Sequence, residues 1–469
     1  MSDQQLNKDL IEEMRQQNRS KRIYEQVVKY AFDYLDNIHE RRVYPSQDAL
    51  ELLASFDERL PQHPQDVLDT LKMLHEKGSP ATVAQGGGRY FGFVNGNIIP
   101  ASLAARWLAD TWDQNAAMYV SSPIAAKCEE VSERWLVDLF GLPADTAAGF
   151  VSGTSTATLC GLLAGRNTLL EKQGWDANES GLFGASPIRV VISEQAHGTV
   201  RKALAILGFG QANIDWIPSD DQGRILPDQI PDLDGNTLLV LQAGNVNTGA
   251  FDPFVPICSR AQEAGAWVHI DGTFGLWAAA CEKTRYLTTG IEMADSWSVD
   301  AHKTLNAPYD SGIVLCKDRS ALVKALQASG SYLQLSQDRD GMLYTPEMSR
   351  RGRGIELWAL LKSLGRSGVD LLVNQLCKNA QLFAAQLSQN GFRILNDVVF
   401  NQVLVACDTP DITKQTLNNI QQSGECWCGG SQWMDEPAIR ISVCSWSTTQ
   451  NDVLSSVKAF IKSRDNSMY

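Results

Sequence analysis

The sequence predicts an α/β fold with a mostly parallel central sheet that is covered by helices on both faces. From about residue 148 onward, short apolar runs alternate with helical segments. Such alternation is typical of parallel sheets, because their strands are buried on both faces and joined by helical crossovers. The length of 469 residues, 44% of them hydrophobic, allows a large core and two or three domains. The predicted strands are 188–193, 237–242, 266–271, 295–300 and 312–316.

The N-terminal part is expected to be helical. Its apolar residues, such as Tyr24, Val27 and Ala31, recur at three- and four-residue steps. An arm of this kind cannot bury its apolar stripe alone, so it should pack on the body or on a partner subunit. The chain is thus divided into an N-terminal helical segment, a large cofactor-binding domain and a small α+β domain, at 1–85, 86–350 and 351–469.

Inside the two domains the periodicity predicts further elements. The large domain should begin with long helices at 99–120 and 124–140. The small domain should combine helices with two strand-forming stretches. Its predicted helices are 354–390 and 450–463, and its predicted strands lie within 391–407 and 438–444.

Composition excludes several classes of partner. The net charge is −13, which argues against a nucleic-acid surface or an anionic membrane. No run reaches the about 18 apolar residues of a membrane span, and the polar start lacks a signal-peptide core. A cytoplasmic location is the default expectation. Ten scattered cysteines fit a reducing compartment, and Cys426-x-Cys428 lacks a second pair, so we predict no metal site.

Two residues indicate the chemistry. Lys303 ends the stretch Ser-Trp-Ser-Val-Asp-Ala-His-Lys, and Asp271 ends the apolar run Ala-Trp-Val-His-Ile-Asp, 32 residues earlier. A lysine amine forms an imine with a cofactor aldehyde. A carboxylate pairs with a protonated pyridine nitrogen and keeps the ring an electron sink. Together they predict that the chain holds pyridoxal 5′-phosphate.

Two further features fit this cofactor, although each also has a structural interpretation. Thr154 and Ser155 lie in a hydroxyl-rich loop that precedes a helical run. Such residues cap helices, and the free N–H groups of a helix start also bind phosphate. His197 follows a predicted strand, where a histidine is commonly structural but is also placed to stack on a pyridine ring. The order of loop, His197, Asp271 and Lys303 favours the cofactor interpretation.

The sequence resembles the group II pyridoxal-phosphate-dependent decarboxylases, relatives of the glutamate, aromatic-amino-acid and diaminobutyrate enzymes. The resemblance runs from about residue 80 to about 460. It rests on Ser296-Trp297 five residues before Lys303, and on Tyr-Thr-Pro-Glu-Met-Ser-Arg-Arg-Gly-Arg at 344–353. It implies a fold-type I enzyme and a homodimer with its site near the subunit interface. It also implies that an L-amino acid is converted to its amine and CO2.

The resemblance also implies roles for individual residues. Lys303 would hold the cofactor, Asp271 would pair with its ring nitrogen, and His197 would stack on the ring, which makes these three catalytic. Thr273 stands where the family usually has alanine, so it touches the cofactor or simply packs. The full set of implied cofactor residues is Thr154, Ser155, His197, Thr248, Asp271, Thr273, Asp300, His302 and Lys303.

The substrate side of the site is less defined by the sequence. Arg440 resembles an arginine that grips the substrate carboxylate in glutamate-specific relatives, although a structural salt bridge is the alternative. The family's proton-donating tyrosine falls near Gly341, flanked by Tyr332 and Tyr344, either of which would serve. The family's His-Pro is Gly87-Gly88 here, so the substrate stays open. The alternatives are an aldehyde synthase, a transaminase or a carbon–carbon lyase on the same fold, or a catalytically silent scaffold.

Overall fold

The computed structural model describes residues 3–327 and 338–467, and its large domain is built on a seven-stranded sheet. The strand order is β2-β8-β7-β6-β5-β3-β4. All pairs from β7 to β4 are parallel, whereas β8 runs antiparallel to both β2 and β7. The strands are β2 Ala147–Val151, β3 Arg189–Ser193, β4 Ile214–Ile217, β5 Thr237–Gln242, β6 Trp267–Asp271, β7 Ser296–Asp300 and β8 Gly312–Cys316.

The predicted fold class is confirmed. The five apolar runs of the sequence are β3 and β5 to β8, within one residue at each end. The sequence did not reveal β2 or β4. The first consists largely of small residues, Ala-Ala-Gly-Phe-Val, and the second is only Ile-Asp-Trp-Ile, so neither carries a long apolar run.

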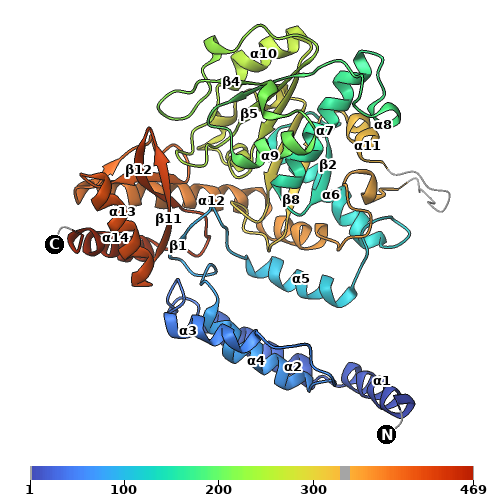
Figure 1. Ribbon diagram of the computed structural model, residues 1–469, viewed down its shortest axis with the longest axis vertical. Coiled ribbons are helices and arrows are strands. Elements are labelled where there is room, and N and C mark those ends of the chain that lie inside the picture. Colours follow the sequence, from blue (N-terminus) through green and yellow to red (C-terminus); the bar gives the residue numbers. More distant parts are fainter. Residues whose placement is uncertain (1–2, 328–337, 468–469) are drawn as a thin grey trace.

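Helices cover both faces of this sheet (Figure 1). Successive strand residues point to opposite faces, so Val190 and Ile192 join one apolar layer and Val191 the other. Each such side chain stabilises the fold by roughly 1.5–3 kcal/mol when it is fully buried. One layer is closed by α7 Thr154–Lys172, α9 Gly198–Ile206 and α11 Arg319–Leu326, and the other by α6 Pro123–Phe140, α10 Phe254–Ala264 and α12 Gly354–Gln389.

The small domain has a five-stranded sheet of order β1-β11-β12-β10-β9. Its first strand comes from the start of the predicted large domain, because Tyr90 and Phe91 pair with Trp427 and Cys428 in parallel. The predicted strand 391–407 is two strands in the structure. The elements are β1 Tyr90–Phe91, β9 Arg393–Ile394, β10 Gln402–Ala406, β11 Trp427–Trp433, β12 Glu436–Ser442, α13 Pro410–Ser423 and α14 Gln450–Asp465.

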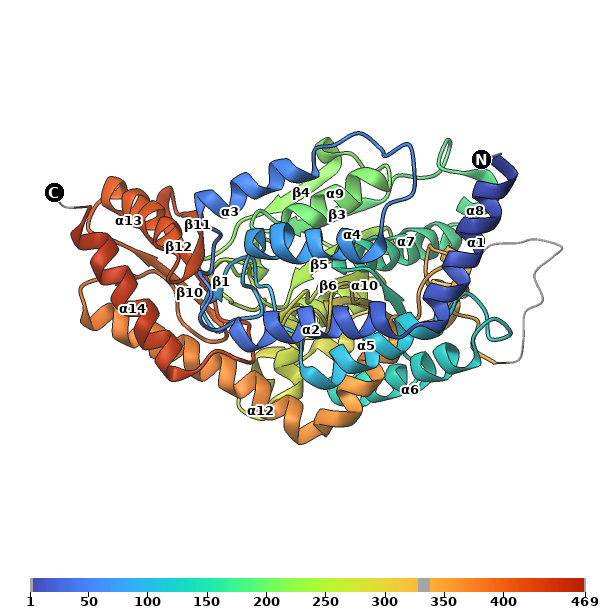
Figure 2. The same cartoon turned by 90° about the horizontal axis from the view of Figure 1, so that it is seen from below.

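The N-terminal helices form an arm that lies apart from the body (Figures 1 and 2). The arm joins the small domain where the Arg42 guanidinium donates to the carbonyls of Gln422 and Ser423. Apolar residues on α2 stay exposed, among them Phe32 at 52%. The helices are α1 Asp3–Arg19, α2 Arg22–Asn37, α3 Gln47–Glu51 and α4 Val67–Met73.

The predicted helix 99–120 is shorter in the structure. Helix α5 spans Pro100–Trp112 and ends because Asp113 adopts a left-handed conformation, with φ of 48°. The residues that follow run as a loop to Ser122, whose side chain caps α6. The sequence pattern missed this break because apolar residues continue beyond it.

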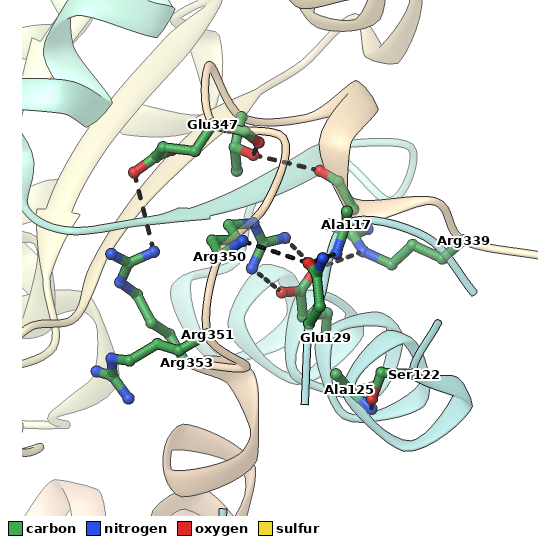
Figure 3. A network of polar contacts seen from close by, with 12 residues as sticks. Ala117, Ser122, Ala125, Glu129, Arg339, Glu347, Arg350, Arg351 and Arg353 are labelled. Carbon is green, nitrogen blue, oxygen red and sulfur yellow. Dashed lines mark hydrogen bonds and ion pairs between the residues drawn. The ribbon is translucent and has the colours of Figure 1, made fainter. Parts of the chain in front are cut away.

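A buried ion network fastens the segment 338–353 to α6 (Figure 3). Glu129 lies between two arginines, with Arg350 Nη1 at 2.6 Å and Arg339 Nε at 3.4 Å. Glu133 is 2.7 Å from Arg339 Nη1 and 2.6 Å from Arg319 Nη2. Two carboxylates and three guanidiniums therefore share one interface, and each carboxylate bridges two cations.

This network accounts for Gly341, where the family's tyrosine was expected. A Cβ atom at this position would collide with the Arg350 guanidinium and the Ala116 carbonyl. The position therefore excludes any side chain. A proton donor, if the protein uses one from this region, has to come from another residue.

We predict that Glu133→Gln lowers stability in a pH-dependent way. Burial raises the pKa of Glu133, but Arg339 and Arg319 outweigh it, and the pKa lies below its ordinary value. The contribution of Glu133 is therefore complete above the unfolded pKa of about 4.3, and is lost as pH falls through the lower, folded pKa. Breaking such a buried pair costs about 3 kcal/mol.

Thermal unfolding should accordingly show a lower midpoint for the variant at about pH 7, and a difference that shrinks below about pH 4. Glu130→Gln on the same helix is the matched control, because Glu130 pairs with Lys127 at an exposed position. An equal effect of both substitutions would contradict the stabilising role of the buried pair.

Candidate active site

A cavity of about 400 Å³ opens at the carboxyl ends of the parallel strands. Open α/β sheets place their ligands at this edge. The cavity gathers residues that the sequence scatters over 150 positions. The predicted residues that line it are Thr154, Ser155, His197, Asp271, Thr273, Asp300, His302 and Lys303.

Lys303 projects into this cavity just beyond the end of β7. Its Nζ lies 3.5 Å from Asp300 Oδ2 and its side chain is 19% exposed. The backbone around it is tightly packed, because a Cβ on Gly96 would collide with the Lys303 carbonyl. The lysine is thus fixed at its root, while its amine faces the open space.

Asp271 ends the neighbouring strand β6 and is 5% exposed. Its Oδ1 accepts hydrogen bonds from the Thr273 N–H at 3.2 Å and the Thr273 hydroxyl at 2.5 Å. Its Oδ2 takes no hydrogen bond from the part of the chain that the structure describes. A buried carboxylate with one oxygen left for a ligand suits the pairing with a protonated ring nitrogen.

His197 lies at the wall of the cavity and caps α9. Its Nδ1 accepts the Thr199 N–H at 3.3 Å and lies 2.8 Å from the Thr199 hydroxyl, so the ring has a fixed orientation. Partial burial lowers the pKa of His197. The negative charge of Asp271 raises this pKa, but the positive charges of Lys303 and Arg440 lower it, and the pKa lies below its ordinary value. The imidazole is therefore neutral near neutral pH.

The start of α7 forms the opposite end of the cavity. The N–H of Ser155, at the second position of this helix, has no acceptor within the described residues, and its side chain is exposed. A free N–H at the positive end of a helix dipole attracts an anion. These features fit the phosphate of pyridoxal phosphate, so both ends of the cavity match the cofactor.

Asp300 lines the cavity and binds the start of α7. Its Oδ1 accepts the Thr154 N–H at 2.7 Å, and its Oδ2 accepts the Thr154 hydroxyl at 3.0 Å. Burial raises the pKa of Asp300, but His302, Lys303 and Thr154 outweigh it, and the pKa lies below its ordinary value. Asp300 therefore holds Thr154, the first residue of α7, in place.

His302 is held beside it in one tautomer. Its Nδ1 accepts the Ser311 N–H at 3.1 Å, which leaves the proton on Nε2. That Nε2 lies 3.3 Å from Asp300 Oδ2. The Tyr309 ring stacks on the imidazole with ring centroids 4.2 Å apart.

Three predicted residues do not line the cavity, namely Thr248, Tyr344 and Arg440. Thr248 is fully buried and donates its hydroxyl to the Gln222 carbonyl at 2.6 Å, while Val246 lines the cavity instead. The turn explains this, because Asn245 Oδ1 accepts the Thr248 N–H and turns the threonine inward. Tyr344 packs against two arginines, with its hydroxyl 3.1 Å from Arg319 Nη1.

Arg440 and Tyr332 were also predicted to belong to the site. Arg440 lies on β12, and its Nε is buried without a partner in the described part of the chain. Its charge contributes to the lowered pKa of His197. Tyr332 lies outside the described residues.

Sequence reasoning missed some wall residues. Gln242 ends β5 in register with Asp271 and lines the same cavity. Its place at a strand end was a usable signal. Tyr309 also lines the cavity and donates its hydroxyl to Asn95 Oδ1 at 2.9 Å. No periodicity marks Tyr309, because it lies in an irregular loop.

The groups that converge at this edge of the sheet fit a pyridoxal-phosphate-dependent enzyme. Residues 50–406 match the family model described as the pyridoxal-dependent decarboxylase conserved domain. The chain belongs to this family. It is a pyridoxal-phosphate-dependent amino-acid decarboxylase.

Curated relatives cover most of the chain at low identity. The tyrosine decarboxylase of Papaver somniferum is 25% identical over 449 residues, which are 86% of each protein. The aromatic-L-amino-acid decarboxylase of Rattus norvegicus is 26% identical over 447 residues, 90% of this chain and 92% of the relative. The aspartate 1-decarboxylase of Aliivibrio fischeri is 30% identical over 272 residues, 54% of this chain and 50% of the relative.

Solved structures share the fold. Oryza sativa TDC with PLP and tryptamine superposes with a TM-score of 0.87 at 20% identity, covering 96% of this chain and 98% of that one. Mouse CSAD gives a TM-score of 0.85 at 19% identity, covering 94% and 98%. Within residues 3–327 and 338–467, no helix is long and apolar enough to cross a membrane.

Proposed function

We propose that Lys303, Asp271 and His197 carry out the decarboxylation, that Arg440 binds the substrate and that two copies of the chain form the working enzyme. The observation that carries the assignment is the convergence of Lys303, Asp271 and the start of α7 on one cavity. Pyridoxal phosphate supplies an aldehyde that binds the substrate amine, and an electron-withdrawing ring that accepts the electron pair left when CO2 departs.

Each catalytic residue has a role that its surroundings support. Lys303 presents an amine at the open side of the cavity and would hold the cofactor aldehyde by a covalent bond. Asp271 leaves Oδ2 without a hydrogen bond from the described residues, and this oxygen would pair with the ring nitrogen and keep it protonated. His197 at the cavity wall would pack against the ring as a neutral imidazole, which adds no repulsion to that positive charge.

The reaction balances without an oxidant. The bond between Cα and the carboxylate breaks, its electron pair stays with the substrate, and a proton returns to Cα. Orientation decides that this bond breaks and no other, because the bond perpendicular to the ring overlaps its π system. A group that fixes the departing carboxylate therefore directs the reaction.

Arg440 is proposed for this carboxylate. Burial lowers its pKa, and in the described part of the chain no carboxylate lies within ion-pair distance of it. A partly buried guanidinium without a partner is costly unless an anion binds it. A substrate carboxylate provides such an anion, and this favours substrate binding over a structural salt bridge.

Holoenzyme supplied with single amino acids tests the reaction. The panel includes tyrosine and aspartate, which are named in the relatives' activities, together with tryptophan and 2,4-diaminobutyrate. We expect CO2 and the matching amine in equal amounts from one of them. Aldehyde and ammonia in place of the amine would support an aldehyde synthase instead.

Lys303→Ala should abolish both products and the visible absorbance of the bound cofactor. The variant loses the amine that bonds to the aldehyde, while the fold keeps its other contacts. Circular dichroism of the two proteins checks the fold. Retained amine production by the alanine variant would refute the assignment of Lys303.

Arg440→Leu should raise KM by about 10- to 100-fold, as expected when a charged hydrogen bond is lost. Arg440→Lys should keep part of the affinity, because it keeps the charge. Arg393→Leu on β9, in the same sheet, is the control, since Arg393 pairs with Glu436 at an exposed position. An unchanged KM for Arg440→Leu would return this arginine to a structural role.

The proposed homodimer rests on exposed apolar residues that the arm and the body present together. Phe32 on α2 is 52% exposed, and Trp107 and Leu108 on α5 are 40% and 54% exposed. A groove of about 350 Å³ lies between these helices, with Leu35, Leu103 and Trp446 also on its walls. Single chains rarely expose contiguous apolar surface of this kind. A second copy, related by a twofold axis, would cover it.

The dimer is tested by sedimentation equilibrium. Wild-type protein should have twice the chain mass of 51.6 kDa. The double substitution Phe32→Glu with Trp107→Glu should shift it towards one chain mass, because charges would be buried in the interface. Phe183→Glu is the control, since Phe183 is 99% exposed elsewhere on the surface. A wild-type protein of single chain mass would refute the dimer.

The cytoplasmic location is part of the same proposal. All ten cysteines are buried and free. Free thiols in this number suit a reducing compartment.

A further inference from the structure

We infer that Thr273 is a positioning residue that sets the orientation of the Asp271 carboxylate towards the cofactor. The inference rests on the proposed role of Asp271. It begins with the hydroxyl of Thr273, which donates to Asp271 Oδ1 at 2.5 Å. The N–H of the same residue donates to the same oxygen at 3.2 Å. Both donors act on one oxygen and leave the other to the cavity.

The threonine itself is held in place by the strand ends. Its carbonyl accepts the Asp300 N–H at 2.8 Å, and the preceding Gly272 N–H donates to the Ser298 carbonyl at 2.9 Å. Gly272 leaves no room for a side chain, because a Cβ there would lie 2.7 Å from the Leu276 Cβ. The hydroxyl therefore sits on a backbone tied to β7, the strand that leads to Lys303.

This rigidity gives the hydroxyl its effect on Asp271. A carboxylate has two equivalent oxygens and turns about its Cβ–Cγ bond over a broad range. Two donors on Oδ1 select one rotation, and the β-branched threonine has few rotamers of its own. Oδ2 is thereby kept towards the cavity before the cofactor binds. Such preorganisation strengthens a charge pair without a new contact to the ligand.

A residue without the hydroxyl at this position would keep the backbone N–H donor to Asp271 Oδ1 and lose the side-chain donor. We expect its loss to weaken the pairing of Asp271 with the ring nitrogen and to leave the fold unchanged.

The experiment compares Thr273→Val, which keeps the shape and removes the donor, with Thr273→Ser, which keeps the donor. Both are measured as holoenzyme without substrate. The valine variant should bind pyridoxal phosphate about tenfold more weakly. Its visible absorbance should titrate with a midpoint at higher pH, because a less firmly protonated ring makes the imine proton less acidic. The serine variant should match the wild type in both measurements.

Several outcomes overturn the inference. Valine and wild type with equal cofactor affinity and equal titration would remove any role for the hydroxyl. A serine variant as weak as the valine variant would show that keeping the donor does not keep the affinity, and would overturn the inference. Thermal unfolding of the cofactor-free proteins checks the fold, and Thr273→Ala repeats the comparison if valine unfolds at a lower temperature.

These readouts need no turnover. If no amino acid releases CO2 yet the cofactor titration follows the hydroxyl, the assignment of the reaction fails and the inference on Thr273 stands. If CO2 is released and the titration is the same with and without the hydroxyl, the assignment of the reaction stands and the inference on Thr273 fails. The two ideas are therefore separable.

Discussion

The buried carboxylate of Asp300 is the interaction on which the site depends. It joins the start of α7 to the end of β7 through the N–H and hydroxyl of Thr154. It also lies within reach of His302 Nε2 and Lys303 Nζ. A carboxylate that is 2% exposed is stable only because these donors satisfy it. The chain thus uses one charge to set the distance between its helix start and its lysine.

Much of this arrangement can be predicted from the sequence. The apolar runs that end at Asp271 and Asp300 are long and bounded, so strands and strand ends follow from periodicity alone. The rule that ligands lie at the carboxyl ends of strands then brings His197 and Asp271 into one site. The pairing of Lys303 with the carboxylate of Asp271 predicted the cofactor, and the resemblance to a family assigned roles to further residues.

Other features depend on contacts that the sequence does not encode locally. Thr248 and Tyr344 are near the site in the chain, but a turn at Asn245 and a pair of arginines direct them elsewhere. The short strand β4 pairs in the sheet without an apolar run of its own. The hydrogen bond from Thr273 to Asp271 likewise depends on a rotamer and a distance. Sequence spacing reveals neither of these.

The electrostatics of the cavity impose one direction on a ligand that has opposite charges at its two ends. The chain as a whole carries −13, so the global field does not attract an anionic cofactor. Within the site, the helix start at Ser155 favours the phosphate, and the free oxygen of Asp271 favours the ring nitrogen. The Asp300 carboxylate accepts two hydrogen bonds from Thr154 and lies 3.3 Å from His302 Nε2. A ligand bound the other way round would place its phosphate against the Asp271 carboxylate. The two buried carboxylates therefore differ in function. Asp300 is satisfied by hydrogen bonds from the protein, whereas Asp271 keeps one oxygen for the ligand.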